Sequence, residues 1–151
     1  MTDAARRILL AILLLGVIGI MAELLLLGHI EDVYQLIPVV LGVATVLMSA
    51  AIVMRPGVAT LRLFQTVMAL MILSGIVGMV LHFQVNIEFQ LEMDAALSGM
   101  NLFRKAILAK TPPALAPGAM IQLGLIGLAY TYKHPSLPRR SLGAGGRERT
   151  T

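Results

Sequence analysis

Four long apolar runs constrain this chain more than any other feature of its sequence. They extend over residues 8–28, 36–54, 63–81 and 114–132. A helix needs about 20 mostly apolar residues to cross a bilayer, and each run is close to that length. Glu23 is the only charged residue inside them. We therefore predict an all-α membrane protein with four transmembrane helices in one domain, residues 1–135.

The composition excludes several classes of protein. With 58% hydrophobic and 13% charged residues in 151, the chain has too little polar surface for a soluble domain. It has no cysteine, which rules out thiolate catalysis and disulfides. No phosphate loop, nucleotide motif or Ser-His-Asp set occurs, so no catalytic residue and no cofactor is predicted, and a non-enzymatic role is favoured.

The basic residues predict the orientation. Short loops on the cytoplasmic side of a membrane carry an excess of lysine and arginine. Placing both termini in the cytoplasm leaves only Arg104, Lys105 and Lys110 outside. The other bases are then inside: Arg6, Arg7, Arg55, Arg62, Lys133, Arg139, Arg140, Arg147 and Arg149. This polarity explains the net charge of +4 better than nucleic-acid binding does, and it predicts a multi-pass inner-membrane protein. The composition of residues 136–151 predicts a disordered basic tail.

The outer segment between the third and fourth runs, residues 82–113, is the only sizeable extramembrane element. Apolar and polar residues alternate from Val85 to Met93, a period of two that is typical of a half-buried strand. A lone strand needs a pairing partner, such as the other outer loop, a second copy or another protein. An extended segment that lies along the lipid headgroups is favoured as much as the strand. A helical continuation of the third run is less favoured.

Helical spacing follows the alternating stretch. Residues 94–109 carry apolar side chains at Leu97, Met100, Phe103 and Ile107, with Arg104 and Lys105 on the opposite side. Asp94 is a suitable N-cap, and Thr111 with the two prolines after it would end the helix. An amphipathic helix of this kind is expected on the outer membrane surface or against the bundle.

Glu23 is the main candidate for a function inside the membrane. Gly16, Gly19 and Glu23 share one face of the first helix, and small residues mark faces where helices approach closely. We expect Glu23 to point into the bundle. A carboxylate there must be protonated, bonded to a partner group or in contact with water, so it suits a proton- or cation-coupled site. The structural alternative is one hydrogen bond to Gln122, at a similar depth in the fourth helix.

Small and hydroxyl residues predict further packing faces. Gly42, Thr45 and Ser49 form a stripe on the second helix, where the hydroxyl groups can bond to their own backbone. Gly124 and Gly127 face away from Gln122 on the fourth helix. That helix is therefore expected to have two contact faces, one within the bundle and one toward a partner or a second copy.

An outer polar cluster combines imidazole and carboxylate groups that could bind a divalent metal. Its members are His29, Glu31, Asp32, His82, Glu88, Glu92 and Asp94. They lack the tight spacing of a His-Glu-x-x-His motif, so a solvated acidic rim is favoured and no metal site is predicted. Haem held by His29 and His82 is less favoured, because both would lie at the edge of the bilayer.

Parts of the chain resemble other membrane proteins. The strings at 28–32, 86–94, 113–124 and 130–135 look like those of uncharacterised small bacterial inner-membrane proteins with four helices. That resemblance implies a fold and no activity. The helix number and the carboxylate in the first span are also similar to small multidrug-resistance transporters.

The sequence leads to three functional hypotheses. The leading one is a non-catalytic accessory or scaffold subunit that binds other membrane subunits or copies of itself. The first alternative is a proton- or cation-coupled transporter or channel component that uses Glu23. The second alternative is an outward-facing metal-binding membrane protein.

Overall fold

The computed structural model describes residues 1–26, 28, 33–109 and 115–137. Within these ranges every regular element is an α-helix, so the predicted all-α class is confirmed for this part of the chain. The helices are α1 (Asp3–Leu26), α2 (Val33–Met54), α3 (Val58–Met93), α4 (Gly99–Ile107) and α5 (Leu115–Thr131).

Three helices, α1, α2 and α3, are long and apolar enough to cross a membrane. The fourth predicted span corresponds to α5, which is apolar but has only 17 residues. At ~1.5 Å per residue α5 is about 25 Å long, somewhat less than the ~30 Å apolar layer. Pro117 lies in its first turn, where backbone N–H groups have no intrahelical acceptor. The chain is thus a small multi-pass helical membrane protein.

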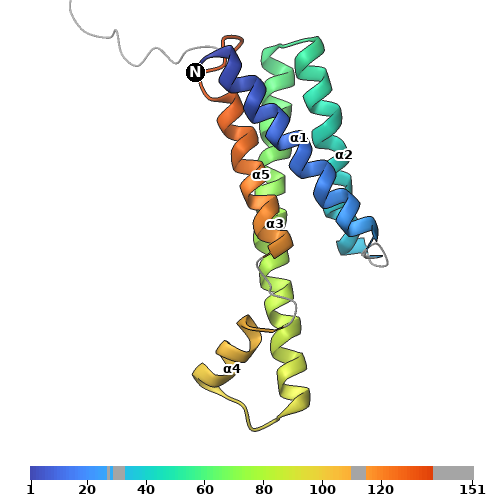
Figure 1. Cartoon of the computed structure of the whole chain (residues 1–151), viewed down its shortest axis with the longest axis vertical. Helices are drawn as coiled ribbons and strands as arrows, with labels where there is room; N and C mark the ends of the chain where they lie inside the picture. The colour runs from blue at the N-terminus through green and yellow to red at the C-terminus, as the bar shows by residue number, and fades with distance from the viewer. Residues whose placement is uncertain (27, 29–32, 110–114, 138–151) are drawn as a thin grey trace, which may run out of the picture.

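The four apolar helices form a closed ring of neighbours. Contacts join α1 to α2, α2 to α3, α3 to α5 and α5 back to α1 (Figure 1). The N-terminus, the turn at residues 55–57 and the end of α5 lie together, which we call the N-terminal end of the bundle. The opposite end carries α4, which packs beside the far end of α3. The first three helices, α1, α2 and α3, run antiparallel to one another in turn, as the short links between them require.

The centre of the bundle is filled with large apolar side chains. Fully buried residues come from several helices and include Leu13, Ile52, Leu61, Phe64 and Met68. The rings of Phe64 on α3 and Tyr130 on α5 meet edge to face, with centroids 6.0 Å apart. Aromatic pairs favour this geometry because the ring edge is positive and the ring face negative.

Glycines allow a close approach of the backbones of α3 and α5. A Cβ atom on Gly75 of α3 would lie 2.6 Å from the carbonyl oxygen of Pro117. On α5, a Cβ on Gly124 would lie 2.8 Å from the carbonyl oxygen of Met68, and one on Gly127 would overlap the Met68 side chain. The Gly124 and Gly127 face, for which a contact was predicted, is therefore used inside the chain against α3.

The stripe on α2 packs as the sequence predicts. Gly42, Thr45 and Ser49 are all buried. The Thr45 hydroxyl donates to the carbonyl oxygen of Leu41 at 2.8 Å, and the Ser49 hydroxyl donates to that of Thr45 at 2.7 Å. Each hydroxyl group thus satisfies itself on its own helix, which lets it lie in an apolar interface. The prediction of close packing at these residues is confirmed.

The strand predicted at residues 85–93 is wrong, because α3 continues as one helix of 36 residues to Met93. A helix satisfies its backbone groups internally, whereas a lone strand would leave them unpaired. The alternating pattern is also compatible with a helix here. At about 100° per residue, Asn86 and Gln90 share one side while Glu88 and Glu92 share another. The first pair lines the surface next to α4, and the second pair is exposed.

The amphipathic helix predicted at 94–109 exists, but it is shorter and begins later. Asp94 does not cap it; instead Asp94 is the C-cap residue of α3, and its side chain accepts a hydrogen bond from the Ala96 N–H at 3.1 Å. Ser98 precedes α4 as its N-cap residue. Aspartate readily accepts from the N–H two residues later, which favours a turn at this position.

Two contacts hold α4 against α3. The Asn86 amide donates to the carbonyl oxygen of Ala106 at 3.1 Å, and both residues are buried. The rings of Phe83 and Phe103 meet edge to face with centroids 5.7 Å apart. Of the predicted apolar stripe, Met100, Phe103 and Ile107 remain exposed on the hairpin. We call residues 82–109, the far half of α3 with α4, the helical hairpin.

Candidate functional site

Three places in the described structure bring polar groups into unusual surroundings. They are a buried arginine at the N-terminal end of the bundle, the outward-facing polar side chains Glu23 and Gln122, and an open groove in the helical hairpin.

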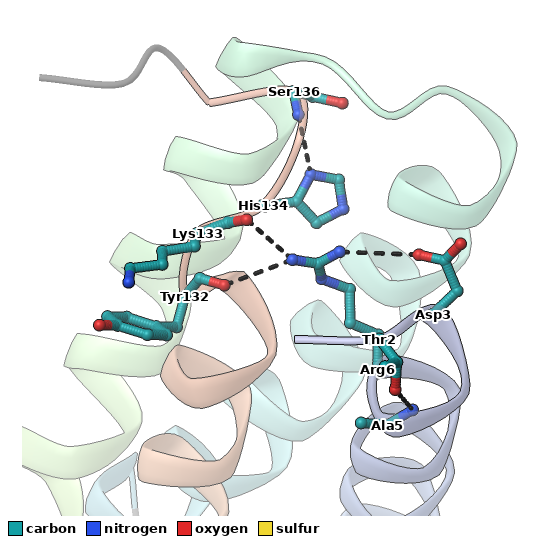
Figure 2. Close-up of polar contacts among 8 residues, drawn as sticks. All are labelled: Thr2, Asp3, Ala5, Arg6, Tyr132, Lys133, His134 and Ser136. Atoms are coloured by element: carbon teal, nitrogen blue, oxygen red, sulfur yellow. Dashed lines mark hydrogen bonds and ion pairs between the residues drawn. The ribbon is translucent and has the colours of Figure 1, made fainter.

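Arg6 is the buried arginine, and only 7% of its surface is exposed. Its Nη2 donates to the carbonyl oxygen of Lys133 at 2.8 Å and to that of Tyr132 at 3.4 Å (Figure 2). Its Nη1 lies 3.7 Å from the Asp3 carboxylate. The last carbonyl groups of a helix have no intrahelical donor, and a cation there also favours the helix dipole. Arg6 therefore joins the start of α1 to the end of α5.

Sequence reasoning assigned Arg6 only a topological role. The signal that could have identified it is its register, because Arg6, Leu10, Leu13 and Val17 recur at helical spacing and all four are buried. An arginine that continues the core face of its helix needs acceptors inside the fold. Its Nε atom is buried without an acceptor in the described part of the chain.

A polar contact between α3 and α5 lies at the same end of the bundle. The Gln65 amide donates to the Thr131 hydroxyl at 3.0 Å, and that hydroxyl donates to the carbonyl oxygen of Leu128 at 2.8 Å. Sequence analysis did not single out Gln65. It is the kind of amide that bonds between helices when it lies inside an apolar run.

His134 lies beside Arg6, and burial together with the Arg6 charge lowers its pKa. The His134 Nδ1 accepts a hydrogen bond from the Ser136 N–H at 3.2 Å, as Figure 2 shows. Burial lowers the pKa of His134 from its ordinary value of 6.5, and the Arg6 charge lowers it further, while Asp3 acts in the opposite direction. The ring also contacts Tyr130, at 5.8 Å between centroids.

The lowered pKa predicts that acid weakens this end of the fold. The unfolded chain binds a proton at His134 more readily than the folded chain, so stability rises with pH across this titration. The contribution is complete above about pH 6.5 and is lost as the pH falls through the lowered folded-state pKa. We expect the melting temperature in detergent to fall more between pH 7 and pH 5 for the wild type than for His134→Asn.

His134→Asn is the matched variant because an asparagine oxygen also accepts from the N–H two residues later but does not titrate. Acidic groups titrate in both proteins, so the difference between their melting curves isolates His134. Parallel loss of stability in the two proteins would contradict the prediction.

Glu23 does not point into the bundle as expected; it is exposed. The predicted face of α1, which carries Gly16, Gly19 and Glu23, does contact the bundle at its first residue, because Gly16 packs against Leu123 of α5. Figure 1 shows, however, that α1 leans away from α5 toward its C-terminal end. Gly19, one turn further along, has no atom within 4 Å of its Cβ position. The same helix face is therefore covered at Gly16 and uncovered at Glu23.

Gln122 is exposed as well, on the side of α5 opposite to its glycines. No hydrogen bond joins it to Glu23 in the described structure, so the single interhelical bond considered for this pair does not form within the chain. Both side chains are exposed, Glu23 on the apolar helix α1 and Gln122 on the apolar helix α5. A functional role for Glu23 and Gln122 stays a prediction.

The predicted outer polar cluster is brought together only in part. His29, Glu31 and Asp32 lie outside the described residues. Glu88, Glu92 and Asp94 are exposed along the end of α3, and His82 lies at least one and a half turns before them. Among the described residues no group of three or more His, Asp or Glu is placed to hold a metal ion.

An open groove of about 1070 Å³ lies in the helical hairpin. Its lining comes from both arms and the link between them: Val85, Asn86, Phe89, Gln90, Leu97, Asn101, Arg104, Lys105, Leu108 and Ala109. Two cations and three neutral amides thus stand beside apolar side chains. Sequence reasoning placed Arg104 and Lys105 opposite the apolar stripe of an amphipathic helix. It missed the groove because the strand expected at residues 85–93 offered no second helix to pack against.

Comparison with known proteins gives no assignment: no family model, curated protein or solved structure matches this chain.

Proposed function

We propose that this chain is a non-catalytic accessory subunit of a bacterial inner-membrane complex, and that it binds its partner through the outer face of α1 and α5. The observation that carries the proposal is the outward position of Glu23 and Gln122. A carboxylate or amide facing hydrocarbon is costly unless another group bonds to it. Neither has such a group within the described chain, so a helix of another subunit or copy would supply it.

The surface around these two side chains suits a helix contact. Gly19 and Ala22 are exposed on the same part of α1. Small residues let a second backbone approach closely enough for van der Waals packing and short interhelical hydrogen bonds. This face is the uncovered continuation of the one that binds Leu123 at Gly16, so it already has the shape of a helix-packing surface.

The charge distribution supports an orientation with both termini in the cytoplasm. The N-terminal end of the bundle carries Arg6, Arg7, Arg55, Arg62 and Lys133. The helical hairpin at the other end carries Arg104 and Lys105. The excess of cations at the first end fits the rule that cytoplasmic loops are basic.

A site-specific photo-crosslinker tests the proposal. Placed at Gly19, where a side chain meets open space, it should give a discrete crosslinked protein in native membranes. Leu47 on α2 is the matched control, since it is exposed on an apolar helix far from the α1–α5 seam. Crosslinks from Gly19 should be strongly reduced in Glu23→Ala and kept in Glu23→Gln, which still forms a hydrogen bond.

Equal crosslinking from Gly19 and Leu47, or only monomer from both, would refute the proposal. Glu23→Gln also separates it from coupled transport, because glutamine cannot carry a proton. The packed centre of the bundle, where Leu13, Phe64 and Met68 are fully buried, favours the subunit role over a polar path through one copy.

A further inference from the structure

We propose that the groove of the helical hairpin binds one anionic phospholipid, with its phosphate between Arg104 and Lys105 and its acyl chains along the apolar residues of the groove. This inference uses a different surface from the α1–α5 face and does not depend on it. It rests on the charge, the lining and the level of the groove relative to the membrane.

The charge of the groove fits an anion. Arg104 and Lys105 both line it, and its lining contains no acidic residue. The nearest acids in sequence, Glu88, Glu92 and Asp94, are all exposed, and none of them lines the groove. Neither cation has an acidic partner among the residues that the structure describes. Arginine and lysine with free donors are the usual protein partners of a phosphate group.

The rest of the lining fits a lipid better than a soluble anion. Val85, Phe89, Leu97 and Leu108 supply apolar surface directly beside the cations. Gln90 and Asn101 add amide groups of the kind that can bond to glycerol or ester oxygens. A small anion would use only the cationic part of a groove of about 1070 Å³, whereas a phospholipid would use both parts.

The groove also begins at the level of the lipid headgroups. The apolar run of α3 ends at Leu81, so Val85 lies about 6 Å beyond it by helical rise. The headgroup layer extends roughly 5–7 Å beyond the apolar core on each side. Met100, Phe103, Ile107 and Leu108 are exposed on α4 near the groove, where an amphipathic helix would rest on the bilayer.

Lipid binding to the purified full-length protein tests the inference. In neutral detergent, native mass spectrometry should find one phosphatidylglycerol retained per chain, against little phosphatidylcholine. The double variant Arg104→Gln, Lys105→Gln should bind phosphatidylglycerol about twenty-fivefold more weakly, because each cation near a membrane surface contributes about a fivefold preference for anionic lipid. Both side chains are exposed, so the variant is expected to fold.

Two controls separate the groove from surface charge. Arg55→Gln, Arg62→Gln removes two exposed cations at the opposite end and should leave the binding unchanged. Val85→Trp fills the groove without altering its charge and should weaken the binding. Equal loss in both double variants, full binding by Val85→Trp, or equal retention of phosphatidylcholine would overturn the inference. Equal retention of glycerol phosphate and phosphatidylglycerol would also overturn it. So would the finding that a second copy of the chain occupies the groove in place of the lipid.

Discussion

Replacing Gly75 with alanine is expected to destabilise the bundle by about 1–3 kcal/mol, the usual cost of overpacking a close interface. The added methyl group would lie 2.6 Å from the Pro117 carbonyl oxygen and 3.1 Å from the Ile121 nitrogen. Both are backbone atoms of α5, so relief requires that the two helices move apart. Thermal unfolding followed by circular dichroism in detergent measures the effect.

Gly78→Ala is the matched control, one turn further along the same face of α3. Its methyl group would make ordinary contacts of 3.4 and 3.5 Å with the Pro117 ring. Alanine also favours a helix over glycine by about 1 kcal/mol. The two variants should therefore change the melting temperature in opposite directions. A similar change in both would show that the α3–α5 approach is looser than the structure indicates.

Arg6→Ala is the second substitution with a large expected effect, a loss of about 2–4 kcal/mol of unfolding free energy. It removes a charged donor from the carbonyl oxygens of Tyr132 and Lys133, and with it the bonds that join the start of α1 to the end of α5. The guanidinium also packs against the bundle, as its side chain is only 9% exposed. Hydrogen exchange at residues 132–137 should rise together with the loss of stability.

Arg7→Ala is the control for charge and topology, because Arg7 is exposed and adjacent in sequence. It removes the same charge from the same end of the chain and should leave the melting temperature nearly unchanged. If Arg6→Ala were no worse than Arg7→Ala, the bonds from α1 to the end of α5 would contribute little to the fold.

The apolar helices were predictable because each needs a long apolar run and the chain has four such runs, three of which form helices long enough to cross a membrane. The packing of Gly42, Thr45 and Ser49 was predictable for a related reason. Helical spacing alone places these three residues on one face, and serine and threonine can bond to their own backbone. Neither inference depends on how the helices are arranged in space.

The strand prediction failed because the same residues fit two periodicities. From Val85 to Met93 polar residues occur at every second position, yet on a helix they divide between the α4 side and the exposed side. The deciding contact is the bond from Asn86 to Ala106, twenty residues later. No local pattern reports a contact at that distance in the chain.

The orientation of Glu23 depended on the angle between two helices. The sequence correctly groups Gly16, Gly19 and Glu23 on one face, but α1 leaves α5 after the contact between Gly16 and Leu123. The part of the face beyond Gly16 is therefore uncovered, and Glu23 is exposed there. A helix face is thus not one environment along its whole length.

By itself, then, the sequence determined that the apolar runs are helical and belong in a membrane, and which of their residues share a helix face. These properties follow from hydrophobicity and from the 3.6-residue period, both of which act locally. The tertiary structure alone decided which faces are covered, that Arg6 bonds to the end of α5, and that α3 and α4 form a groove around Arg104 and Lys105. Those features depend on helix angles and on contacts between residues far apart in the chain, which packing of the whole bundle selects.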